Sequence, residues 1–400
     1  ASAYSALKRC QNHVTDFRPV PSQQMMRMKL RRLAPPALIS IAVLVTVVWL
    51  LTRFFGFALV KSQSGHSLAD SVVSTPVHLS SVEDIPENII IVIADGLGFS
   101  HLTAARAINH GLRTPVAWDR FEAYGWQQSH PETGLIIDSA ASATALATGH
   151  ETRYGAVGID ARGESLTSLF EHGHLVGYRL GIVTDSYIWD ATPAAFVSES
   201  TDRDDAEGIL RQLASSELEV LFGELEDVGE GAVPEKQATL DLLQQRFVLL
   251  DSTLKGPPPP TPVAMVVDED VINDLESVPN LPQMTDAALS RLTSDERPFL
   301  LLVESEEADA ASHSNDFDRL VLGMKALEAT LTLVLDFAET SGETLVLFTS
   351  DHETGGLALS ISDNSNVNLE AIWSSADHTG VAVPVMAYGP GAGNFSGIHS

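Results

Sequence analysis

The sequence Asn88-Ile-Ile-Ile-Val-Ile93, followed directly by Ala94-Asp95-Gly96, decides the expected fold of this chain. A short apolar run that ends at a turn residue is typical of a strand buried on both faces. Three further segments repeat the pattern: Leu180–Val183, Phe299–Val303 and Thr344–Phe348. Because helical patterns separate these strands, the sequence predicts an α/β fold with a large, mostly parallel central sheet and helices on both faces.

Two other regions are assigned to the margin of that sheet. Val383–Tyr388 reads as a strand, and its proline predicts an edge position, because proline has no N–H for a second neighbour. Residues 215–298 mix acidic helical patterns with glycine- and proline-rich turns. We expect a peripheral insertion there, with a helix near Met284–Leu292.

Carboxylates stand at the ends of the predicted strands. Asp95 follows the first strand, Glu304 ends the third, and Asp351 follows the fourth. In open α/β sheets the carboxyl ends of the strands meet at the ligand-binding edge. One acid there would mean little, but three with nearby histidines predict convergence on a cation.

The stretch from Ile136 to Gly149 leads through Asp138-Ser139 into an alanine-rich run that favours a helix. Ser or Asp before such a run caps the helix N-terminus, where free backbone N–H groups attract anions. Ser139 is therefore a candidate nucleophile or anion-binding group. For the stretch taken alone, a merely capped, closely packed helix is the preferred interpretation, which only neighbouring motifs can overturn.

Three segments carry candidate metal ligands. Asp309 and His313 are four residues apart and share a helix face, as in half of a zinc site. Asp351 and His352 lie at a strand end, and His378 precedes the last strand. Taken singly, a solvated acidic helix face and a structural histidine are the plainer alternatives.

Asp190-Ala-Thr192-Pro reads as a turn that enters a helix and offers oxygen donors suited to Mg²⁺. Arg203 follows, and an arginine fork is the usual clamp for phosphate oxygens. The alternative for Arg203 is an ordinary surface salt bridge with the aspartates that surround it, Asp202, Asp204 and Asp205.

Charge and cysteine content restrict the classes of function. The formal net charge is −29, and residues 1–61 hold nine of the 24 Lys and Arg but only one of the 53 Asp and Glu. The strongly acidic remainder argues against a nucleic-acid-binding surface. The single cysteine, Cys10, lies in the leader, so a metal must be held by histidines and carboxylates.

The chain divides into four predicted regions. Residues 1–36 form a polar and basic leader, the first 27 of which we interpret as a mis-called extension or a remnant outside the native start. Residues 37–60 are apolar behind a Lys/Arg cluster, which predicts a signal peptide or an uncleaved membrane anchor rather than a buried core helix. Residues 61–85 form a polar linker, and residues 86–400 form the folded domain that carries the candidate site.

With these pieces in order, the sequence resembles the alkaline phosphatase family from about Asn88 to Ser396. The landmarks, which follow one another in the family's order, are Ala94-Asp95-Gly96-Leu-Gly98, Asp138-Ser139-Ala-Ala-Ser142, Thr148-Gly149, Asp190-Ala-Thr192-Pro, Val303-Glu304, Asp309, His313, Asp351-His352-Glu-Thr-Gly-Gly356, His378-Thr-Gly380, and Tyr388-Gly-Pro with Asn394-Phe-Ser-Gly397. Relatives usually continue into a last helix, so we expect a C-terminus truncated at Ser400.

The resemblance implies hydrolysis of phosphate monoesters through a phosphoserine on Ser139, with Arg203 clamping the phosphate. It implies two Zn²⁺ and one Mg²⁺, with Co²⁺ as the alternative in the paired sites. The implied ligands are Asp309, His313 and His378 for one zinc, Asp351 and His352 for the other, Asp95 bridging towards magnesium, and Thr192, Glu304 and a water held by Asp190 for magnesium.

The resemblance also implies export to the periplasm or the extracellular face, and it leaves membrane anchoring through residues 37–60 and assembly as a homodimer open. Two rival functions remain: a phosphodiesterase or sulfatase of the same superfamily, and a catalytically silent surface protein that binds phosphate or metal. Arg203 favours monoesters over diesters, because it would meet an oxygen that a diester lacks.

Overall fold

The computed structural model describes residues 85–225, 236–361 and 369–399. The predicted leader, the segment 37–60 and nearly all of the linker lie outside these residues. Within the described ranges, no helix combines the length and the apolar character needed to cross a bilayer.

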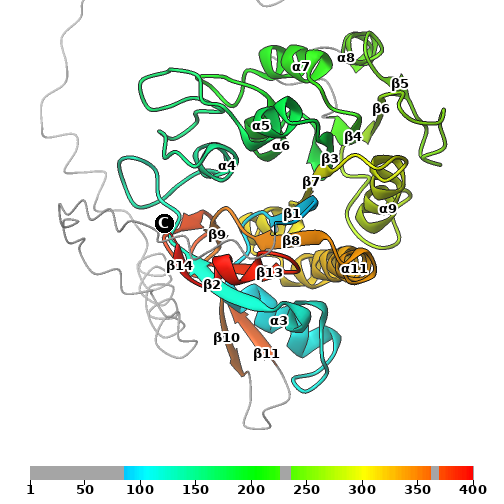
Figure 1. Cartoon of the computed structure of the whole chain (residues 1–400). Coiled ribbons are helices and arrows are strands. Elements are labelled where there is room, and N and C mark those ends of the chain that lie inside the picture. Colours follow the sequence, from blue (N-terminus) through cyan, green and yellow to red (C-terminus); the bar gives the residue numbers. More distant parts are fainter. Residues whose placement is uncertain (1–84, 226–235, 362–368, 400) are drawn as a thin grey trace, which may run out of the picture. The chain divides into compact units, whose positions relative to one another are not determined.

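A ten-stranded sheet forms the centre of the described chain (Figure 1). Its strands, in spatial order, are β14 (Gly397–His399), β2 (Ala123–Gln127), β13 (Val383–Tyr388), β8 (Thr344–Thr349), β1 (Asn88–Ala94), β7 (Phe299–Ser305), β3 (Arg179–Tyr187), β4 (Val220–Leu225), β6 (Val263–Asp268) and β5 (Val248–Leu249). Only β13 runs antiparallel to its neighbours in this sheet. The predicted α/β class with a mostly parallel sheet is therefore confirmed.

Helices cover both faces of this sheet (Figure 1). One face carries α3 (Phe99–Asn109), η2 (Ala117–Arg120), α9 (Leu281–Leu292) and α11 (Phe317–Ser341), and the other carries α4 (Ser139–Thr148), α5 (Leu169–Leu175), α6 (Ala191–Val197), α7 (Ala206–Ser215) and α8 (Lys236–Leu243). The strands alternate accordingly: in β1, Ile90 and Val92 join the first core, whereas Ile91 and Ile93 join the second. Burial of both faces explains the continuous apolar runs in the sequence.

The remaining elements lie after β7 and near the C-terminus. They are α10 (Glu307–His313), η3 (Ala392–Phe395) and two small antiparallel sheets, β9 (Glu353–Thr354) with β12 (His378–Thr379) and β10 (Ala358–Ile361) with β11 (Leu369–Ile372). The β9–β12 pair sets His378 opposite Thr354. It thereby joins two segments that carry predicted metal ligands.

The edge position predicted for Val383–Tyr388 is wrong, because β13 lies between β2 and β8. Pro384 falls at the second residue of the strand, and the pairing with β8 starts only at Val385. The Thr349 hydroxyl donates to the Pro384 carbonyl at 2.9 Å. A proline at the start of a strand leaves the rest of the ladder intact, so it can occupy an internal strand.

Residues 215–298, for which we expected a peripheral insertion, supply β4, β5 and β6 at one end of the sheet. The expected helix in this region is α9, which begins at Leu281 and ends at Leu292. Its Asn280 cap accepts from the Gln283 N–H at 3.0 Å. The region therefore extends the central sheet, and the domain boundaries drawn from the sequence stay a prediction.

Candidate active site

The carboxylates predicted at the strand ends lie on neighbouring strands. The strand order β8-β1-β7-β3 (Figure 1) brings Asp351, Asp95 and Glu304 to the same edge of the sheet, where Asp185 on β3 joins them as a fourth carboxylate. All four are at least nine-tenths buried. Burial and the neighbouring charges of Asp351 and Asp309 raise the pKa of Asp95 well above its usual value. Such a concentration of buried carboxylates is costly unless a cation balances it.

Helix α4 places Ser139 at this edge. Asp138 is the N-cap residue and accepts from the Ala141 N–H at 3.2 Å, and Ser139 is the first helical residue. Gly149, with φ of 73°, ends the helix in the left-handed conformation. Ser139 is 6% exposed, and its Oγ lies 3.2 Å from His352 Nε2. The hydroxyl is thus held at a helix N-terminus, beside a histidine.

A first group of predicted ligands surrounds His352. Its Nε2 lies 3.1 Å from Asp351 Oδ2 and 3.5 Å from Asp95 Oδ1. The other Asp351 oxygen accepts from the N–H groups of Gly96 and His352, whereas Asp351 Oδ2 and Asp95 Oδ1 are buried without a hydrogen bond. Burial lowers the pKa of His352, which favours the neutral ring that a metal requires.

A second group joins Asp309 and His313 on α10 with His378 on β12. His313 Nε2 lies 3.2 Å from both Asp309 Oδ2 and His378 Nε2. Each ring binds a backbone carbonyl through Nδ1 at 2.7 Å, His313 that of Ala376 and His378 that of Ile137. The hydrogen bond with Asp309 raises the pKa of His313 to about 9. The raised pKa shows that a positive charge, whether a proton or a metal ion, is favoured at His313 Nε2 beside Asp309.

Both groups have the composition of a metal site. One nitrogen or oxygen atom from each of Asp309, His313 and His378 lies within 4.8 Å of the others, and the same holds for Asp95, Asp309 and His352. Asp309 belongs to both sets. Imidazole rings whose Nδ1 binds a carbonyl present Nε2 as a ligand. Nitrogen and carboxylate donors without thiolate suit zinc or a related divalent ion, so the residues fit that cation.

The third set, Asp190, Thr192 and Glu304, offers oxygen atoms only. Glu304 is 1% exposed and accepts from the Thr184 hydroxyl at 2.5 Å. Burial and the nearby charge of Asp190 raise the pKa of Glu304 to about 8. Thr192 Oγ1 is buried and makes no hydrogen bond of normal geometry. These hard donors fit Mg²⁺.

Arg203 does not pair with the aspartates next to it in the chain. Its guanidinium lies 2.9 Å from Asp190 Oδ1 and 3.6 Å from Asp138 Oδ2. Asp138 also accepts from the Gly155 N–H at 3.0 Å. The N-cap of the Ser139 helix therefore orients the arginine, and the surface salt bridge considered from the sequence is not what the structure shows.

Gly96 provides a test of how tightly Asp309 is packed. Gly96 has φ of 69°, and an added Cβ would lie 2.5 Å from Asp309 Oδ1 and 2.7 Å from its Cα. Gly96→Ala should therefore displace a predicted ligand and lower stability by about 1–3 kcal/mol from strain and overlap. Gly149→Ala is the matched control, because it has φ of 73° with nothing within 4 Å. Thermal unfolding and zinc titration of both variants check this, and equal effects of the two would contradict it.

Three residues that support the site were not predicted from the sequence. Asp138 anchors Arg203, and the Thr354 hydroxyl donates a hydrogen bond to Asp309. Burial, together with the nearby charges of Asp190 and Glu304, raises the pKa of Glu306 well above its usual value. All three stand within three residues of a predicted site residue, but short-range sequence patterns do not show which way their side chains point.

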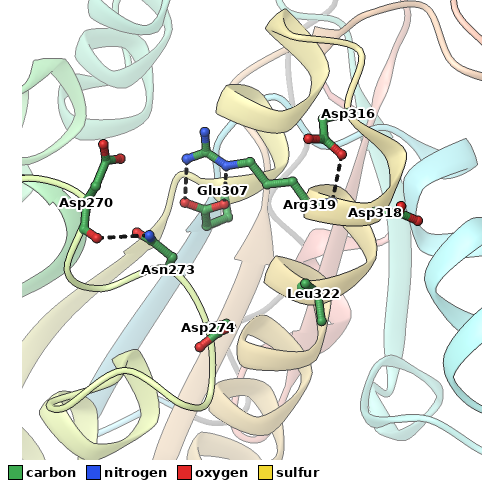
Figure 2. A pocket seen from close by; sticks show the side chains of 8 residues that line it. All are labelled: Asp270, Asn273, Asp274, Glu307, Asp316, Asp318, Arg319 and Leu322. Carbon is green, nitrogen blue, oxygen red and sulfur yellow. Dashed lines mark hydrogen bonds and ion pairs between the residues drawn. The ribbon is translucent and has the colours of Figure 1, made fainter.

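A cavity lies apart from the predicted site residues. It measures about 560 Å³, and Figure 2 shows its acidic lining, in which Arg319 pairs with Glu307 through two bonds of 2.8 Å. None of the predicted site residues lines it: the lining residues are Asp270, Asn273, Asp274, Glu307, Asp316, Asp318, Arg319 and Leu322. The chemistry described above therefore does not depend on this cavity.

The model of the alkaline phosphatase family matches residues 86–222 and 262–372. Alkaline phosphatase 4 of Bacillus subtilis (strain 168) is 27% identical over 408 residues, which cover 78% of this chain and 85% of that protein. The solved alkaline phosphatase of the Antarctic bacterium TAB5 is similar with a TM-score of 0.70 at 25% identity, over 79% of this chain and 95% of that one. A variant of the TAB5 enzyme, with a TM-score of 0.69 at 26% identity over the same shares, is described with Mg bound in its M3 site.

Proposed function

Because this chain belongs to the alkaline phosphatase family, we propose that it hydrolyses phosphate monoesters through a phosphoserine on Ser139 and releases inorganic phosphate. The observation that carries the proposal is the position of Ser139 Oγ, 3.2 Å from His352 Nε2 at the edge where the buried carboxylates gather. A hydroxyl placed there is close to both groups of candidate metal ligands.

We assign the metals by the donor sets. Asp309, His313 and His378 would hold one Zn²⁺, Asp351 and His352 a second, and Asp95 would lie between the second zinc and Mg²⁺. Thr192 and Glu304 would bind Mg²⁺ directly and Asp190 through water, and Mg in the TAB5 variant supports a third site of this kind. When bound, these ions supply Lewis-acid stabilisation of negative charge and lower the pKa of oxygen nucleophiles.

The protein's own groups position the reaction. Ser139 Oγ would attack phosphorus in line with the leaving alcohol, and the first N–H groups of α4 would face the anionic phosphate. Water would then cleave the phosphoserine and regenerate the hydroxyl. In a loose transition state, negative charge spreads over the phosphoryl oxygens. Hydrogen-bond donors that are already fixed around these oxygens stabilise that charge.

Arg203 supplies such donors. Its two ion pairs leave the guanidinium charged and oriented, because Asp190 and Asp138 approach different terminal nitrogens. We propose that the fork binds two non-bridging phosphate oxygens. A diester carries a substituent on one of the oxygens that a monoester leaves free, so Arg203 favours monoesters.

The test compares three substrates on the full chain. We expect p-nitrophenyl phosphate to be hydrolysed at least ~100-fold faster than its bis ester or p-nitrophenyl sulfate, because a lost charge-assisted contact in the transition state costs about 3 kcal/mol. Chelation should abolish the activity, and Zn²⁺ with Mg²⁺ should restore it. A preference for the bis ester or the sulfate would indicate the rival hydrolases, and metal binding without turnover would indicate a silent binding protein.

We also propose that the enzyme acts outside the cytoplasm. The excess of Lys and Arg before an apolar segment at residues 37–60 supports export, with that segment as a signal or anchor. Small phosphate monoesters would be its partners in solution. Whether two copies pair as a homodimer is a separate question, which sedimentation of the purified chain answers.

A further inference from the structure

Thr354 contacts predicted ligands of both metal groups. Its hydroxyl donates to Asp309 Oδ1 and lies 3.3 Å from His352 Nδ1. Its backbone pairs with His378 in the β9–β12 ladder, and its N–H donates to the Gly96 carbonyl at 3.0 Å. Thr354 is fully buried, so water cannot replace these contacts.

The single hydroxyl proton determines the direction of this chain of hydrogen bonds. A carboxylate can only accept, so the Thr354 proton points to Asp309. The hydroxyl oxygen is then free to accept, and the partner within reach is His352 Nδ1–H. With that bond in place, the proton of neutral His352 is on Nδ1, and the lone pair of Nε2 faces Ser139 Oγ, Asp95 and Asp351, which is the arrangement that a cation between Nε2 and these carboxylates requires.

We propose that Thr354 is a positioning residue that couples the two metal-ligand groups, holding Asp309 through its proton and fixing the tautomer and ring orientation of His352 through its oxygen. Partners of this kind orient metal ligands and raise metal affinity. The inference rests on the proposed function, because it assumes that these groups hold Zn²⁺. Thr354 itself contacts neither substrate nor metal.

The test measures zinc affinity of the full-length protein by competition with a chromophoric chelator, after the protein has been stripped of metal. Thr354→Val keeps the shape of the side chain and removes the hydroxyl, so it should weaken zinc binding by roughly 10–100-fold. Thr354→Ser should bind within about threefold of the wild type, whereas Thr354→Ala, which differs from it only by the hydroxyl, should match the valine variant.

Thr330→Val is the matched control. Thr330 is also fully buried, and its hydroxyl bonds the Ala326 carbonyl within α11, away from the site. It should leave zinc affinity unchanged. Wild-type affinity in Thr354→Val, or equal weakening in Thr354→Ser and Thr354→Ala, would overturn the inference. A wild-type protein that binds no zinc would instead overturn the proposed function.

Discussion

Ser139→Ala is expected to lower the turnover of p-nitrophenyl phosphate by at least ~10³-fold, or about 4 kcal/mol of transition-state stabilisation. The hydroxyl is the proposed nucleophile, and the neighbouring His352 and carboxylates are assigned to metal binding, so no group with the same position and a free electron pair replaces it. The bound zinc should remain, because the ligand groups do not need Ser139 to keep their positions. Steady-state kinetics together with metal analysis of the same preparation measures both.

Ser215→Ala is the control for this variant. Ser215 is an exposed residue of α7 whose hydroxyl bonds backbone carbonyls of its own helix. The turnover of the Ser215→Ala variant should equal that of the wild type. Turnover in Ser139→Ala within tenfold of the wild type would show that another group attacks phosphorus, and the assignment of the nucleophile would be abandoned.

Asp309→Ala should have the next largest effect, because Asp309 is the one residue shared by both described ligand groups. Its Oδ2 lies 3.2 Å from His313 Nε2, and its Oδ1 accepts from Thr354. Burial opposes its charge, but other interactions, led by the hydrogen bond from His313, outweigh burial and lower the pKa of Asp309 to about 2. The carboxylate is thus ionised and ready to bind a cation.

We expect Asp309→Ala to lose the zinc that Asp309 would hold with His313 and His378, and to weaken the second zinc, because the carboxylate also lies within 4.8 Å of the ligand atoms of Asp95 and His352. Turnover should fall at least ~10³-fold, since metal chemistry and its positioning are lost together. His313→Ala removes a ligand from one group only, so it should retain one zinc. Asp318→Asn, an exposed change on the first turn of α11, is the control that should alter neither quantity. Two zincs in Asp309→Ala with full turnover would contradict the shared-ligand geometry.

The sequence predicted the centre of the fold well because the strands there are buried on both faces. Asn88–Ile93 and Phe299–Val303 lie within the observed strands β1 and β7, which are neighbours in register. A short, continuous run of apolar residues is stable in water only when both of its faces are buried, as they are in a central strand of a covered sheet. The convergence of the acids at the strand ends could also be predicted, because parallel strands place their carboxyl ends at one edge of the sheet.

Long-range pairings account for what the sequence could not predict. Pro384 taken alone predicts an edge strand, because proline has no N–H to donate to a second neighbour. In the structure the neighbouring strand β8 ends at Thr349, which pairs with Val385, so β8 requires no N–H from Pro384. Likewise, Arg203 stands among three aspartates in the chain and pairs with two others, Asp190 and Asp138. Tertiary packing determines such partners, and the spacing of residues in the sequence carries no information about them.

Capture of the phosphorylated enzyme tests whether Ser139 is the group that attacks phosphorus. The full chain, loaded with Zn²⁺ and Mg²⁺, is mixed with a phosphate monoester at mildly acidic pH, quenched in acid within milliseconds and digested for mass spectrometry. We expect one phosphorylated peptide, with the phosphate on Ser139, that disappears when substrate is exhausted. Phosphate on another residue, or burst kinetics with an unmodified Ser139, would contradict it.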